Sequence, residues 1–291
     1  MRCDLHVHTK ASGRISTPFI RHFCKESYND PEAVYDRCKR LGMSIVTVTD
    51  HDSIDAAEIL RGRPDFFLSE EVTCAMPSGT ELHLGAYAVS ERDHIEIQRR
   101  RTDFLSLLMY LTERKIFYSV NHVFSGLTGA RELEDFEWFA SYALALETRN
   151  GQMCHRANIE AERLAVSYGK IGIAGSDSHT LSGLARTYTE VPGARSIEEF
   201  FAGLRARRGR IRGEHGSLAK ITADVFRITA SLFTETPWTL ALFPLVVLLP
   251  AVTVSHWINE IRFCKKWSKQ LNAGDSAPRL LWDLDTSLRE A

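Results

Sequence analysis

Short apolar runs alternate with longer helical patterns through the first two thirds of this 291-residue chain. The runs are CDLHVH, SIVTVTD, FFLSEEVT, ELHLGAYAV, IFYSVNH, ALALETRN and KIGIAGSD. Between them the spacing predicts helices over 30–41, 95–114 and 157–168, the first with Asp30 and Pro31 at its start. Strand, polar loop, helix and strand in this order are typical of a parallel sheet covered by helices. The sequence therefore predicts an α/β domain of barrel type over residues 1–215.

Histidines and carboxylates gather where these apolar runs end. The six histidines at such positions are His6, His8, His51, His83, His122 and His179. His51, His122 and Asp177 directly follow an apolar run, which is where a (β/α) barrel places its active site. His6 and His8 are two residues apart, so on a strand both point to one face and can bind one ion. Imidazole with carboxylate suits Zn²⁺, Mn²⁺ or Fe²⁺ rather than Ca²⁺.

Each of these motifs alone has an ordinary structural explanation. TDHDS is compatible with a helix cap, NHV with a buried core histidine, and GSDSH with a turn. The joint pattern favours a metal site. Without one, each of these strand ends would need its own separate structural explanation, and all of them together are improbable.

Charge and cysteine usage narrow the class of protein. The chain has 36 basic and 37 acidic residues, so no stable binding to duplex nucleic acid is expected. The cysteines are scattered without a C-x-x-C pair, and the start of the chain shows no leader pattern. We therefore expect the protein to be cytoplasmic and its cysteines to be reduced thiols. These are Cys3, Cys24, Cys38, Cys74, Cys154 and Cys264.

The C-terminal part differs in composition, and we place a boundary near residue 215. Residues 236–259 contain no Asp, Glu, Lys or Arg, a length that is enough to cross a hydrocarbon core of about 30 Å. Pro244 and Pro250 interrupt the segment, and basic residues follow it, which favours the cytoplasmic side.

We therefore expect a helical region over 216–291 with a membrane-associated hairpin at 236–259 on the inner face of the membrane. The amphipathic stretch 218–233 would lie in the interface. The alternative is a buried hairpin that packs on the barrel or on a second subunit.

The motifs taken together resemble a known family. DLHVHT, VTVTDHDS, EEVT, ELHLGAY, VNHVF and IAGSDSHT appear in the order of the signature motifs of the PHP (polymerase and histidinol phosphatase) superfamily. The resemblance covers about residues 1–215 and is strongest to the stand-alone metal-dependent phosphoesterases. It implies a distorted (β/α)₇ TIM-like barrel with a C-terminal helical, apolar extension, and a site for two or three divalent ions.

The resemblance also implies roles for particular residues. The implied ligand groups are His6, His8, Glu71 and Asp177 for a first ion; Glu71, His83 and His122 for a second; and His51 and His179 for a third. Glu70 is the alternative to Glu71 as the bridging carboxylate. Asp50 and His179 are the candidates for moving a proton, and the alternative for Asp50 is that it supports the ligands from behind.

One loop departs from the family pattern. Relatives commonly supply a ligand to the third ion here, either an Asp or a His one residue later, and this chain has Gly13 and Arg14 in those two places. A third ion would then have only two protein ligands and bind weakly. We expect Arg14 to bind the substrate phosphate instead, with Arg149 and Arg186 as further candidates.

The function implied is metal-dependent hydrolysis of a phosphomonoester, nucleotide or short oligonucleotide by a hydroxide that bridges two ions. A C–N hydrolase of the amidohydrolase type and a non-catalytic scaffold in a membrane-bound assembly are the alternatives. The amidohydrolase class usually brings a carboxylated Lys at a strand end, and no Lys follows an apolar run at the right place.

Overall fold

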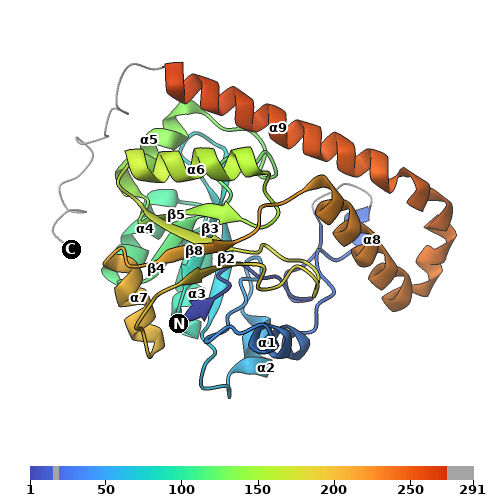
Figure 1. The fold of residues 1–291 in the computed structure, drawn as a ribbon, viewed down its shortest axis with the longest axis horizontal. Helices are drawn as coiled ribbons and strands as arrows, with labels where there is room; N and C mark the ends of the chain where they lie inside the picture. The colour runs from blue at the N-terminus through green and yellow to red at the C-terminus, as the bar shows by residue number, and fades with distance from the viewer. Residues whose placement is uncertain (16–19, 274–291) are drawn as a thin grey trace.

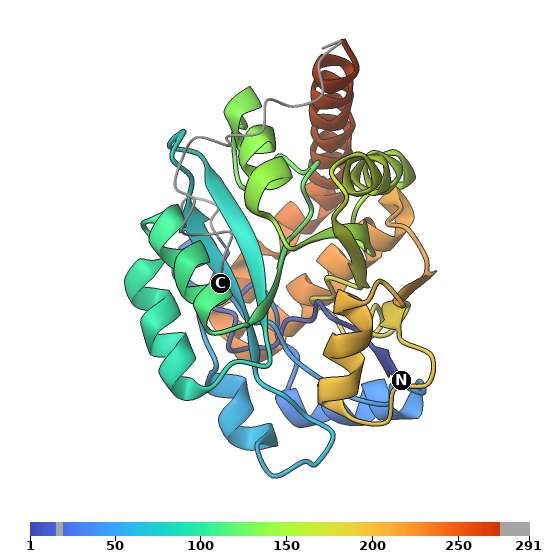
Figure 2. The same cartoon turned by 90° about the vertical axis from the view of Figure 1, so that its left-hand side faces the viewer.

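The computed structural model describes residues 1–15 and 20–273, in which two β-sheets are surrounded by helices (Figure 1, Figure 2). The five-stranded sheet has the order β2 (Ser69–Ala75), β3 (Glu81–Tyr87), β4 (Phe117–Val120), β5 (Ala145–Asn150), β6 (Ile171–Gly175). The three-stranded sheet has the order β1 (Arg2–Cys3), β7 (Thr187–Glu190), β8 (Arg210–Gly213). Helices lie outside these sheets, so the chain has the α/β architecture that the sequence predicts.

The larger sheet is mixed rather than parallel. β2, β3 and β4 pair antiparallel, whereas β4, β5 and β6 pair parallel. The wholly parallel prediction is wrong for β2 and β3, because a tight turn with Met76 N bonded to Thr80 O (2.8 Å) joins them directly. A parallel pair needs a longer crossover. Neither sheet is closed within residues 1–15 and 20–273.

Two predicted strands are extended segments with little ladder pairing. The run CDLHVH keeps only β1, and SIVTVTD has an isolated bridge from Val46 to Phe66. Side chains replace backbone partners here: Val7 N donates to Thr49 Oγ1 (3.0 Å), and Ser176 N donates to the Asp4 carboxylate (2.8 Å). His6 and His8 therefore lie on an irregular extended segment, which one isolated parallel bridge, from Val7 to Ser178, connects to its neighbour.

The helices follow the predicted pattern with one division. Their bounds are α1 (Pro31–Arg40), α2 (Asp55–Leu60), α3 (Glu91–Arg100), α4 (Phe104–Glu113), α5 (Leu133–Tyr142), α6 (His155–Ser167), α7 (Ile197–Arg205), α8 (Leu218–Glu235) and α9 (Leu249–Ala273), with 3₁₀ helices η1 (Ile20–His22) and η2 (Pro237–Leu248). The predicted start of α1 is confirmed, since the Asp30 carboxylate accepts from Glu32 N (3.0 Å). The predicted helix 95–114 is two helices, because Asp103 accepts from Ser106 N (3.1 Å) and caps a new start.

The C-terminal helices form an antiparallel pair, but not the predicted one. Thr222 Oγ1 of α8 lies 2.9 Å from Thr253 Oγ1 of α9, and the rings of Phe233 and Phe243 are 6.2 Å apart. The chain turns at Thr236, because Pro237 has no N–H to continue α8. Residues 237–272 are one continuous helical arm, so a hairpin inside 236–259 is wrong.

The far half of α9 belongs to the main core. Cys264 and Trp267 are buried in the apolar cluster that also contains residues of the larger sheet, α4, α5 and α6. By length and composition, 237–272 is the one stretch of the described chain that has the properties of a membrane-crossing helix. All six cysteines are buried and unpaired. Residues 274–291 of the predicted C-terminal region lie outside the described residues, and the boundary near residue 215 stays a prediction.

Candidate metal centre

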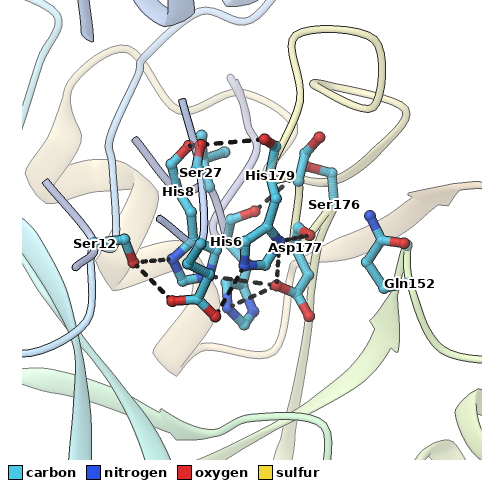
Figure 3. A network of polar contacts seen from close by, with 12 residues as sticks. His6, His8, Ser12, Ser27, Gln152, Ser176, Asp177 and His179 are labelled. Atoms are coloured by element: carbon cyan, nitrogen blue, oxygen red, sulfur yellow. Dashed lines mark hydrogen bonds and ion pairs between the residues drawn. The ribbon is translucent and has the colours of Figure 1, made fainter. Parts of the chain in front are cut away.

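His6 and His8 are fully buried and point toward the same carboxylates (Figure 3). His6 Nε2 is 3.1 Å from Glu71 Oε2 and 3.5 Å from Asp177 Oδ1. His8 Nε2 is 3.4 Å and 3.3 Å from the same two oxygens. The irregular segment thus brings the first predicted ligand group together around one point.

Glu71 lies at the centre, and its neighbour Glu70 does not. Adjacent strand residues point to opposite faces. Glu70 Oε2 therefore lies outside the cluster, 2.9 Å from His94 Nδ1 and 2.8 Å from Gln98 Nε2. Glu71 is buried to the same degree but is surrounded by imidazoles. Only Glu71 has the position that a bridging ligand requires.

The second predicted group meets the other oxygen of Glu71. Glu71 Oε1 is 3.3 Å from His122 Nε2 and 3.6 Å from His83 Nδ1, and these two nitrogens are 3.3 Å apart. Asn121 Nδ2 donates to the same oxygen (2.8 Å) and fixes the orientation of the carboxylate. The two Glu71 oxygens therefore face different histidines, because His83 and His122 lie near Oε1, whereas His6, His8 and His51 lie near Oε2.

Two predicted ligands sit on backbone that L-residues rarely adopt. Asp177 has φ 50° and His122 has φ 29°, both in the left-handed region. Asp177 N donates to His6 O (2.8 Å), and His122 N donates to Glu147 Oε2 (3.0 Å), so hydrogen bonds hold both conformations. Such residues concentrate at functional sites, where surrounding structure determines the backbone.

A residue that the motifs did not indicate, Glu26, lies between His51 and His179. Its Oε2 is 3.4 Å from His51 Nε2, and its Oε1 is 3.3 Å from His179 Nε2. Glu26 N donates to Gly13 O (3.2 Å), so the backbone at Glu26 lies beside the backbone at Gly13. The carboxylate thus arrives beside the position where relatives commonly carry an Asp.

Further polar residues hold the cluster from behind. Glu147 Oε1 is 2.9 Å from His6 Nδ1, and Asn150 Nδ2 donates to Asp177 Oδ2 (2.9 Å). Ser12 Oγ is 2.9 Å from His8 Nδ1. Glu147 and Asn150 stand near the end of the run ALALETRN, a position that resembles those of the predicted ligands, but no family motif marks them.

Asp50 does not contact the clustered histidines through its side chain. Its two oxygens accept from Thr9 N (2.6 Å) and Thr9 Oγ1 (2.7 Å). Burial raises the pKa of Asp50 to about 6, and these hydrogen bonds oppose the shift. This geometry fits the alternative that Asp50 holds the loop after His8.

The arginines predicted to bind phosphate have other partners. Arg14 donates to His22 O, Arg149 to Gly213 O (3.3 Å), and Arg186 to Ser182 O (2.9 Å). A different arginine, Arg227 of α8, pairs with Asp224 at 3.0 Å but also lines a cavity together with His179. Sequence reasoning missed Arg227 because it lies in a helix interpreted as part of the tail.

The pKa shifts differ among the clustered residues. Burial, with the charges of His179 and His51, lowers the pKa of His8 to about 4. Burial alone would raise the pKa of Glu71, but the surrounding histidines, His6 first, hold it well below its usual range. Burial alone would lower the pKa of His6, but Asp177 and Glu71 raise it well above its usual range, a position where a cation is favoured.

The residues present fit divalent ions. His8 Nε2 is buried and has no hydrogen-bond partner among the described residues, although it faces two carboxylates. Ligand atoms within 4.8 Å of one another occur in three overlapping groups, His6, His8 and Asp177; His6, Glu71 and His122; and His8, His51 and Glu71. Imidazole and carboxylate form the donor set of Zn²⁺, Mn²⁺ and Fe²⁺ sites.

Two cavities meet at His179. The first, about 160 Å³, runs from the cluster toward the C-terminal helices; its surface is mostly apolar, although Asp177, Asp224 and Glu260 also line it, and we call it the apolar cavity. Its lining includes Asp177, His179, Ile221, Val225, Ile228 and Trp257. The second, about 340 Å³, is the polar cavity, and its lining includes Tyr28, His179, Thr180, Ser182, Arg227 and Ser231. α8 therefore forms a wall of the site.

Comparison with solved structures finds similar chains. PsfC from Pseudomonas syringae PB-5123 has a TM-score of 0.55 at 15% identity, covering 79% of this chain and 98% of that chain. A protein described as a metal-dependent phosphoesterase from Bifidobacterium adolescentis has a TM-score of 0.45 at 12% identity, covering 69% and 95%. An amidohydrolase from Chromobacterium violaceum with bound sulfate has a TM-score of 0.46 at 13% identity, covering 72% and 98%.

Sequence comparison gives one family match. No curated protein matches the chain. A family model described as PHP-associated matches residues 155–208, the segment from α6 to α7. This match and the fold shared with PsfC are consistent with the resemblance to the PHP superfamily that the motifs carry.

Proposed function

We propose that this protein is a metal-dependent phosphoesterase that hydrolyses a small phosphomonoester. The observation that carries the proposal is the position of Glu71: Oε2 lies 3.1 Å from His6 Nε2, and Oε1 lies 3.3 Å from His122 Nε2. This arrangement supports a carboxylate shared by two ions. Two such ions, when bound, activate water at neutral pH and neutralise the oxygens of a phosphoryl group.

The chain's own residues have three tasks in this proposal. His6, His8 and Asp177 hold the first ion and, with Glu71, exclude other conformations of the cluster. His83 and His122 hold the second. His179 borders both cavities, so it contacts a substrate that enters from either.

We further propose that Glu26 completes a third ion site. The sequence predicts only His51 and His179 there, which would leave the ion weakly bound. A carboxylate within 3.4 Å of both imidazoles supports a stronger site with three protein ligands. Glu26 then takes the place of the Asp that the loop after His8 lacks.

Glu26→Gln is expected to reduce the number of ions bound per chain by about one and activity by about 10-fold. The amide keeps the shape of the side chain but loses the negative charge that the ion requires. Elemental analysis of the dialysed protein gives the ion count. The matched control is Glu32→Gln on the exposed first turn of α1. An unchanged ion count in the Glu26 variant would exclude it as a ligand.

The cavities favour a small substrate over an oligonucleotide. Sites for drug-sized ligands have volumes of about 300–1,000 Å³; the apolar cavity has about 160 Å³ and the polar cavity about 340 Å³, which is room for a small molecule. Arg227 and the hydroxyls of Thr180, Ser182 and Ser231 line the polar cavity beside His179, which supports binding of phosphate oxygens there. We infer that the alcohol part of the substrate is short and mostly apolar.

The test is a hydrolysis screen of the purified chain paired with metal analysis. We expect release of phosphate from phosphomonoesters, with loss of activity by more than about 100-fold after chelation and recovery with Mn²⁺, Zn²⁺ or Fe²⁺. Nucleotides, short oligonucleotides and simple amides form the other arms. Hydrolysis confined to amides would favour the C–N hydrolase, and metal binding without hydrolysis of any substrate would favour the scaffold. Phosphate release that survives chelation would contradict the proposal.

A further inference from the structure

A group of apolar side chains on η2 and the start of α9 is exposed, and we call it the apolar tip. Each of its members is more than half exposed: Trp238, Leu240, Phe243, Leu245, Val247, Leu248 and Val252. The surrounding residues 236–259 carry no charge. In Figure 1, α8 and the segment that follows it stand away from the two sheets. An exposed apolar surface of this continuity marks a site of interaction.

A basic stripe follows the tip along the same helix. Its exposed members are Arg262, Lys265, Lys266 and Lys269. The spacing i, i+3, i+4 and i+7 places them on one face of α9. The opposite face, with Cys264 and Trp267, is buried in the core, so the stripe must face solvent. No ion pair joins these four cations to a carboxylate within residues 20–273.

We propose that the apolar tip and the basic stripe together dock the protein onto an anionic lipid bilayer. Apolar side chains without charged neighbours enter the boundary between headgroups and acyl chains, and a tryptophan such as Trp238 is favoured there. Cations on the adjoining face bind the anionic headgroups. A second protein would be recognised by complementary acids and hydrogen-bonding groups, but the tip offers no charge for such pairing.

The arm docks on the bilayer and does not cross it. Crossing would require residues 236–259 to leave their place in the protein, where Thr253 Oγ1 lies 2.9 Å from Thr222 Oγ1 and Trp257 lines the apolar cavity. Glu260 accepts from Gly126 N (3.1 Å), and Trp267 packs against the ring of Phe136 at 5.3 Å. These contacts fix the far half of α9 to the catalytic body. Only the near half is free to enter the interface.

Docking also positions the metal centre. The ring of Trp238 lies 5.0 Å from that of Phe23, and Glu235 pairs with Lys25 at 2.9 Å. Lys25 precedes Glu26, so the tip contacts the loop that reaches the cluster. α8 and α9 also line the apolar cavity. The bilayer would therefore lie against the side of the protein that contains α8 and α9, which line the apolar cavity. This holds whatever substrate the site accepts.

Cosedimentation of the full chain with vesicles tests the proposal. Vesicles of phosphatidylcholine with phosphatidylglycerol are expected to bind the protein at least about 10-fold more strongly than vesicles of phosphatidylcholine alone. Phe243→Ser with Val247→Ser is expected to reduce binding at least about 10-fold to both. Lys265→Glu with Lys266→Glu is expected to abolish the preference for anionic lipid and its dependence on salt.

Val166→Ser on α6 is the matched control, because Val166 is as exposed as the tip but lies on a different helix. It should bind vesicles as the unchanged chain does. Absence of vesicle binding, or equal binding by the tip variant, would overturn the proposal. Analytical ultracentrifugation of the same proteins covers the remaining outcome: a dimer that only the tip variant disrupts would make this surface a subunit interface and also overturn it.

Discussion

Glu71→Gln is expected to lose bound metal and at least about 100-fold of activity, whereas Glu70→Gln keeps both. The two side chains are adjacent and equally buried, at 1% and 0% exposed. Glu71 faces the histidines of the cluster, while Glu70 binds His94 and Gln98. The Glu71 amide can neither supply the negative charge nor bridge two ions.

Glu70→Gln therefore serves as the control for burial and for strand position. This substitution is expected to lower the free energy of unfolding by about 1–3 kcal/mol, because the hydrogen bonds of residue 70 with His94 and Gln98 weaken. Ion content by elemental analysis, activity and thermal unfolding of both variants separate the two effects. If Glu70→Gln lost the ions and Glu71→Gln kept them, the assignment of the bridging ligand would be reversed.

Glu147→Gln is expected to weaken metal binding and activity by about 10–100-fold, although Glu147 lies behind the ligands. Its carboxylate is 2.9 Å from His6 Nδ1 and accepts from His122 N, so it orients one ligand from each predicted ion site. The amide keeps the volume of the side chain but removes the negative charge that makes the imidazole of His6 a stronger metal ligand. Glu147 is thus a positioning residue.

Its distinguishing signature is recovery with excess metal. Titration with Mn²⁺ should restore most of the activity of Glu147→Gln, because the ligands themselves remain. Glu160→Gln, a buried carboxylate on α6 that pairs with Arg163, is the control and should need no extra metal. An activity loss that saturating metal leaves unchanged would show that Glu147 acts in some other way.

The sequence was most informative where chemistry repeats at strand ends. His6, His122 and Asp177 are far apart in the chain, yet their positions after apolar runs predict that they meet, and they do. The relative direction of the strands was less predictable, because the apolar runs of β2 and β3 contain no signal that distinguishes parallel from antiparallel pairing.

Glu26 and Glu147 escaped prediction for different physical reasons. Glu26 reaches the cluster because the chain after Gly13 returns to it, and a return of this kind leaves no periodic signal in sequence. Glu147 occupies a strand position like those of the ligands, but its role depends on which imidazole nitrogen it faces. The C-terminal arm was predicted from its missing charges alone, so the turn at Thr236 and the burial of Trp267 came only from the structure.

The left-handed backbone at His122 and Asp177 has a consequence for the thermodynamics of ion binding. Holding such residues costs about 1–3 kcal/mol each, and that cost is met when the chain folds. The chain would therefore lose little further conformational entropy when an ion binds. Most of the binding free energy would then contribute to affinity rather than to ordering the ligands. This protein differs in that respect from small zinc domains, whose ligands are gathered only when the ion arrives.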